Sequence, residues 1–155
     1  MDSNYFELKA FYLHYADRFM NVAKMPESIR PAEAIKRAEA ISASRARKGV
    51  EAAINDVMEQ TSDWRPDQVA AFDAELADLG ITKFSSLRRQ YSKRYLAILK
   101  RGSIRSLAEY YLVKGSFDSG SVETGAGECE RIEAMLNDFE TGLAASLKQK
   151  PSAPK

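Results

Sequence analysis

Residues that interrupt helices or cross-link small folds are scarce in this chain of 155 residues. Only 8 glycines and 5 prolines are present, so few positions can break a long helix. Cys129 is the only cysteine, which excludes an intrachain disulfide and favours a reducing, cytoplasmic compartment. No apolar run approaches the roughly 18 residues that a membrane-spanning helix needs, and the N-terminus lacks the basic stretch of a secretory signal. We therefore expect neither membrane insertion nor secretion.

Groups that perform catalysis or bind metals are also scarce. The single histidine, His14, excludes a zinc site built on two histidines. The glycine-rich stretch 116–127 lacks both the Lys-Ser/Thr pair of a phosphate-binding loop and the side-chain oxygens of a calcium loop. We therefore expect no catalytic residue, no cofactor and no metal, and we interpret the chain as non-enzymatic. Only convergence of His14 with two acids in one deep pocket would favour catalysis.

Apolar residues recur at spacings of three and four along most of the chain, which is the period of amphipathic helices. Capping residues, prolines and glycines divide this pattern into segments. The apolar stripe changes phase near Ser42, Ser44 and Gly49, so a kink or a division into two helices is expected there. We expect helices over about residues 3–24, 31–60, 66–80, 82–102, 103–115 and 128–148.

These segments predict an all-α fold, a compact bundle of five to six mostly antiparallel helices in a single domain over residues 1–148. The first segment carries six of the 15 aromatic residues between Tyr5 and Phe19, and such a broad apolar face is typical of core. The residues 116–127 read as a loop, and 149–155 as a disordered tail.

Charges of opposite sign are separated along the chain, although the net charge is only +1. Between residues 51 and 78 there are eight acidic residues against one basic residue, Arg65. Between residues 83 and 105 every charge is positive. These cations are Lys83, Arg88, Arg89, Lys93, Arg94, Lys100, Arg101 and Arg105.

A helical wheel of residues 82–102 predicts an amphipathic helix with a basic outer ridge. Its apolar residues fall within one arc. Arg89, Lys93 and Lys100 lie opposite this arc, and Arg94 and Arg101 flank these three residues. The ridge consists of Arg89, Lys93, Arg94, Lys100 and Arg101. Three interpretations are open: a solvated face paired with the chain's own acids, a docking surface for an acidic protein, and a surface for nucleic-acid phosphates.

We expect a cytoplasmic protein-binding module, a regulator, adaptor or neutraliser of a protein, that uses this ridge. The expected partner is an acidic protein or a second copy of the chain, because opposite charges favour specific association. The alternative is a small DNA- or RNA-binding regulator that uses the same helix. An acidic helix, the turn 80–82 and a basic helix follow one another in the order of a helix-turn-helix, although Ser86 stands where a buried aliphatic residue is expected.

Overall fold

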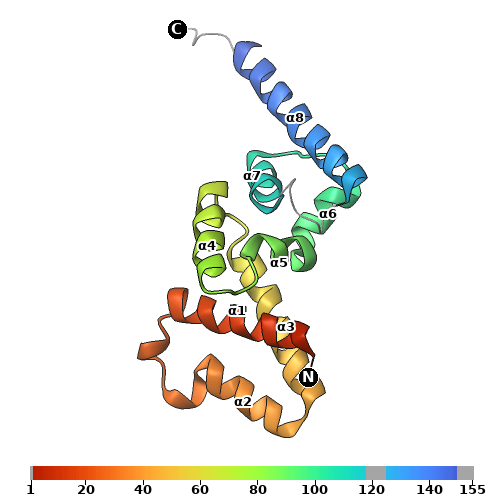
Figure 1. Ribbon diagram of the computed structural model, residues 1–155. Helices are drawn as coiled ribbons and strands as arrows, with labels where there is room; N and C mark the ends of the chain where they lie inside the picture. The colour runs from red at the N-terminus through yellow and green to blue at the C-terminus, as the bar shows by residue number, and fades with distance from the viewer. Residues whose placement is uncertain (1, 118–124, 150–155) are drawn as a thin grey trace.

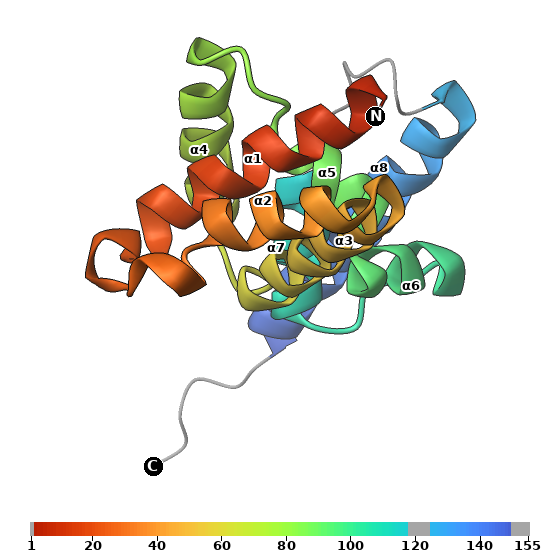
Figure 2. The same cartoon turned by 90° about the horizontal axis from the view of Figure 1, so that it is seen from below.

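The computed structural model describes residues 2–117 and 125–149, and in these ranges it is built from helices without strands. The predicted all-α bundle is confirmed (Figures 1 and 2). Two of the expected helices are each divided in two, so the described ranges contain eight α-helices. These are α1 (Ser3–Phe19), α2 (Pro31–Ile41), α3 (Ala43–Gln60), α4 (Pro66–Asp78), α5 (Phe84–Tyr91), α6 (Lys93–Arg101), α7 (Leu107–Ser116) and α8 (Ala126–Gln149).

A serine causes each division. The backbone of Ser42 is extended, which ends α2, and its side chain accepts a hydrogen bond from the Arg45 amide and caps α3. A kink or a division was expected here, and the structure has the division. Ser92 likewise ends α5 and caps α6 by accepting from the Tyr95 amide at 3.1 Å. The prediction of one continuous helix over 82–102 is therefore wrong.

Other helix ends differ from the expected ones by a few residues. The first helix ends at Phe19, and two short 3-10 turns at Val22–Lys24 and Glu27–Ile29 lead to α2. Ser106, rather than the expected Ser103, caps α7. The predicted stop at Gly102 is confirmed, since its φ of 85° is a left-handed conformation that glycine adopts without strain. Most of the predicted loop and tail, residues 118–124 and 150–155, lies outside the described residues.

Two hydrophobic clusters hold the helices together. The larger cluster joins α1 to α5, and within it the buried residues Tyr5, Leu8, Phe11 and Tyr15 confirm that the aromatic face of α1 is core. The smaller cluster joins α6, α7 and α8. Since α5 belongs to the larger cluster and α6 to the smaller one, Ser92, which caps α6, lies at the boundary between the two clusters. Figure 1 shows this order, with α1–α3 at one end and α8 at the other.

Candidate functional site

The break at Ser92 changes the shape of the predicted basic ridge. Arg89 belongs to α5, whereas the other four residues of the ridge belong to α6. The half-buried Arg89 side chain donates to the carbonyl of Ser116 in α7 at 2.7 Å and to the hydroxyl of Ser86 at 3.2 Å. Arg89 therefore helps to join α5 to α7. The expectation that Arg89 projects outward with the α6 cations is wrong.

The remaining cations share the outer side of one short helix. Tyr95, Ile98 and Leu99 are the buried residues of α6, and burial raises the pKa of Tyr95 to about 12. The other six residues are exposed. We call them the basic α6 surface: Lys93, Arg94, Leu96, Ala97, Lys100 and Arg101. Lys100 follows Lys93 by seven positions, so this surface extends about 10 Å along the helix axis.

Within the described residues, one of these four cations forms an ion pair with a carboxylate. Arg101 forms an ion pair with Glu109 at the start of α7. The hydrogen bonds that Glu109 accepts from Arg101 and from the Arg105 amide lower its pKa, against the opposing effect of partial burial. In the described ranges no carboxylate lies within 4.0 Å of Lys93, Arg94 or Lys100. Glu109 also interacts electrostatically with Arg94, beyond the distance of an ion pair.

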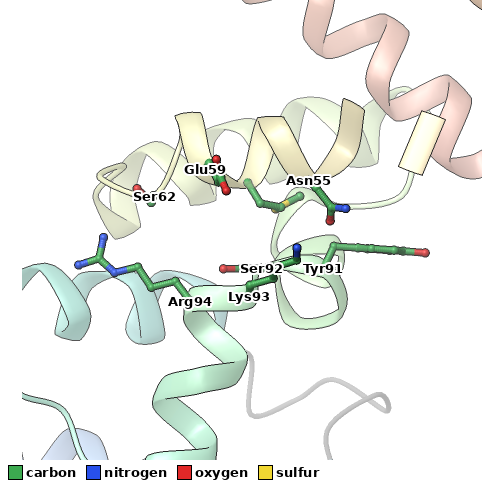
Figure 3. A pocket seen from close by; sticks show the side chains of 8 residues that line it. Asn55, Glu59, Ser62, Tyr91, Ser92, Lys93 and Arg94 are labelled. Carbon is green, nitrogen blue, oxygen red and sulfur yellow. The ribbon is translucent and has the colours of Figure 1, made fainter. Parts of the chain in front are cut away.

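A cavity of about 310 Å³ opens beside this surface, between the second half of α3 and the junction of α5 with α6 (Figure 3). Figure 3 shows Asn55, Glu59 and Ser62 on one side of the opening and the residues of the α5–α6 junction on the other. Lys93 and Arg94 belong both to the pocket and to the basic α6 surface. The complete lining is Asn55, Met58, Glu59, Ser62, Tyr91, Ser92, Lys93 and Arg94.

The pocket offers the chemistry of a binding site. Met58, only 3% exposed, supplies an apolar wall that is continuous with the larger hydrophobic cluster. Lys93 and Arg94 supply positive charge, and Glu59 supplies one carboxylate. The Ser92 oxygen is occupied as the cap of α6, which holds the first turn in place. A side chain with an apolar body and an acidic or hydrogen-bonding end fits this combination.

Comparisons with protein-family models, curated proteins and solved structures find no significant match. No helix in the described ranges combines the length and apolar character needed to cross a membrane. The same ranges contain no group of three or more histidine, cysteine, aspartate or glutamate side chains placed to hold a metal ion.

Sequence reasoning missed the half of the pocket that α3 contributes. Asn55, Glu59 and Ser62 precede Lys93 by more than thirty positions, and no sequence pattern links them to it. The packing of α5 on α3 brings them opposite the start of α6. One signal was present in the sequence: Ser92 itself, because serine is a preferred residue at helix N-caps.

His14 lies on α1 against α4, and it meets one carboxylate. Its Nε2 is 2.5 Å from Oε2 of Glu75, and its ring stacks on Phe72 with the centroids 5.9 Å apart. Glu75 also accepts from Nε of Arg18 at 2.8 Å. The second acid that would favour catalysis is not among the described partners of His14. The contacts of His14 thus join α1 to α4.

The contacts of Glu75 predict a pH dependence of stability. Hydrogen bonds from Arg18 and His14 lower the Glu75 pKa from 4.5 to about 2. The contribution of a carboxylate with a lowered pKa is complete above its unfolded-state pKa and disappears as the pH falls through the folded-state value. We expect the melting temperature of the wild type to exceed that of Glu75→Gln near neutral pH. The difference should shrink between about pH 4.5 and 2. A difference that stays constant over this interval would contradict the assignment.

Proposed function

We propose that the protein is a non-enzymatic, cytoplasmic binding module whose basic α6 surface docks an acidic segment of a protein partner. One observation carries the proposal: Lys93, Arg94 and Lys100 are exposed on one helix beside an open pocket, and none of them has a carboxylate within 4.0 Å among the described residues. Complementary charges of this kind accelerate encounter and fix the register of two proteins. The single cysteine supports a reducing compartment.

The mixed character of the surface favours a protein over a nucleic acid. Leu96 is 44% exposed in the middle of the cations, and Ala97 lies next to it. A protein partner can bury this apolar area. The cores of protein interfaces are likewise apolar, with charged residues at their rims. Phosphates, in contrast, would gain nothing from the exposed Leu96. We therefore propose that carboxylates of the partner lie around Leu96.

The alternative function, binding of DNA or RNA, rests on the four cations of α6 alone. Lysine and arginine side chains neutralise phosphates irrespective of sequence, and the resulting affinity falls steeply with salt. Self-association is a third outcome, because α8 carries exposed carboxylates such as Glu130 and Glu133. A change of sedimentation coefficient with protein concentration would reveal it.

A fluorescence-anisotropy titration tests the proposal. The first probe is a labelled decapeptide of glutamates with two leucines, and its control carries glutamine at every glutamate position. The second probe is a labelled DNA duplex long enough to remain paired under the conditions of the titration. At near-physiological salt we expect micromolar binding of the acidic peptide, with negligible binding of the glutamine peptide or the duplex. Binding of the duplex alone would favour the nucleic-acid alternative and contradict the proposal.

A further inference from the structure

A second cavity, of about 230 Å³, lies on a different part of the molecule, where the end of α1 meets the start of α4. Figures 1 and 2 show the two helices crossing, with α4 next to the C-terminal half of α1. Three aromatic rings from separate elements line the cavity: Phe19 from α1, Trp64 from the α3–α4 connection and Phe72 from α4. We call the three rings, together with the Glu75 carboxylate at their rim, the aromatic hollow.

The three rings pack edge to face and leave part of the hollow open. The Phe19 centroid is 5.3 Å from those of Trp64 and Phe72, and the Trp64 and Phe72 centroids are 5.8 Å apart. The interplanar angles lie between 68° and 80°. Phe72 is buried, whereas Phe19 is 43% exposed and Trp64 is half-buried. The hollow therefore presents aromatic surface to solvent beside a carboxylate.

The chain's own Arg18 shows which chemistry this arrangement accepts. Its guanidinium carbon lies 4.9 Å from the centroid of the Phe19 ring. Its Nε donates to both oxygens of Glu75, at 3.0 and 2.8 Å. A cation is thus held at once by an aromatic face and by a carboxylate, which is the combination that favours guanidinium and ammonium groups. Because the Arg18 side chain is about half exposed, it can be displaced without opening the core.

We propose that the aromatic hollow binds an arginine side chain of a cationic segment in a protein partner. Charge complementarity selects the occupant, because electron-rich ring faces and the Glu75 carboxylate attract a cation and disfavour an anion. Arg18 acts as an internal competitor for the same carboxylate. This site lies apart from the basic α6 surface and takes a ligand of the opposite charge, so the proposal does not depend on the function proposed for α6.

Trp64 is the only tryptophan in the chain, so its fluorescence reports on the hollow directly. The probe is the peptide acetyl-Gly-Arg-Gly-Arg-Gly-amide, and its control replaces each arginine with the uncharged isostere citrulline. We expect a saturable change of Trp64 emission with the arginine peptide and none with the citrulline peptide. Equal responses to the two peptides, or no response to either, would overturn the proposal.

Two substitutions act in opposite directions. Glu75→Gln removes the carboxylate and is expected to weaken arginine-peptide binding about fivefold. Arg18→Gln removes the competitor and is expected to strengthen binding by about the same factor. Loss of folding cannot produce this gain. Asp78→Asn, a matched change at an exposed position of α4 outside the hollow, should leave the affinity unchanged. Weaker or unchanged binding by Arg18→Gln would overturn the role of Arg18.

Discussion

Reversal of three exposed cations, in the variant Lys93→Glu, Arg94→Glu, Lys100→Glu, is expected to weaken binding of the acidic peptide by about 100-fold or more. The reason is that three attractive contacts become repulsive, and like charges facing each other across an interface cost several kcal/mol. None of the three side chains is buried, so the fold should tolerate the changes. The measurement is the anisotropy titration, with circular dichroism to confirm an unchanged helical content.

A matched control distinguishes the effect of where the charges lie from the effect of the net charge of the protein. Lys36, Arg37 and Lys48 are also exposed cations, and they lie on α2 and α3. Their replacement by glutamate changes the net charge by the same amount as the triple variant on α6. We expect this control to change the affinity by no more than about threefold, because salt screens distant charges. An equal loss in both variants would show that net charge, and not the basic α6 surface, drives binding.

Replacement of Arg88 is expected to have the largest effect on stability. This residue of α5 is fully buried, and burial lowers its pKa to about 10. Its Nη2 donates to the Thr61 carbonyl, and its guanidinium lies 4.9 Å from the Phe84 ring centroid. Nε and Nη1 have no hydrogen-bond partner among the described residues. The nearby acids Asp73 and Asp63 favour the charged form electrostatically.

Two substitutions separate the packing of Arg88 from its charge. Arg88→Ala leaves a cavity at the junction of α4, α5 and α7, and we expect a loss of about 3–5 kcal/mol in the free energy of unfolding. Arg88→Met fills most of the space without a buried charge, and apolar replacements of buried ions are often neutral or stabilising. We expect the methionine variant to stay within about 1 kcal/mol of the wild type in urea unfolding. Equal destabilisation by both variants would show that the guanidinium itself stabilises the fold.

A boundary between two helices could be predicted from the sequence where the apolar stripe changes phase at that boundary. At Ser42 the apolar stripe shifts phase, and a kink or a division was expected there. At Ser92 it does not shift, because Leu87, Tyr91 and Tyr95 continue the spacing of three and four across the cap. Periodicity alone cannot detect such a break. Only the capping preference of serine could have indicated it.

The arginines of α5 illustrate a second limit. Arg88 follows Phe84 by four residues and precedes Tyr91 by three, so it lies on the buried face, and the wheel contained this signal. The inward turn of Arg89 had no comparable signal, because it depends on the Ser116 carbonyl at the end of α7. The pocket beside Lys93 also depends on a contact between distant helices. Tertiary packing, which a single sequence does not specify locally, decides these features.

Site-specific photo-crosslinking from Ala97 tests the central claim most directly, because this small exposed residue lies in the middle of the basic α6 surface. A photoreactive amino acid replaces Ala97 in one variant and the exposed Ala74 of α4 in a control variant, and both are irradiated in cells that produce the protein naturally. We predict a discrete protein adduct from Ala97 alone. It should carry an acidic segment at the crosslinked site and should disappear when Lys93, Arg94 and Lys100 are reversed. Adducts with nucleic acid, or identical adducts from both positions, would contradict the account.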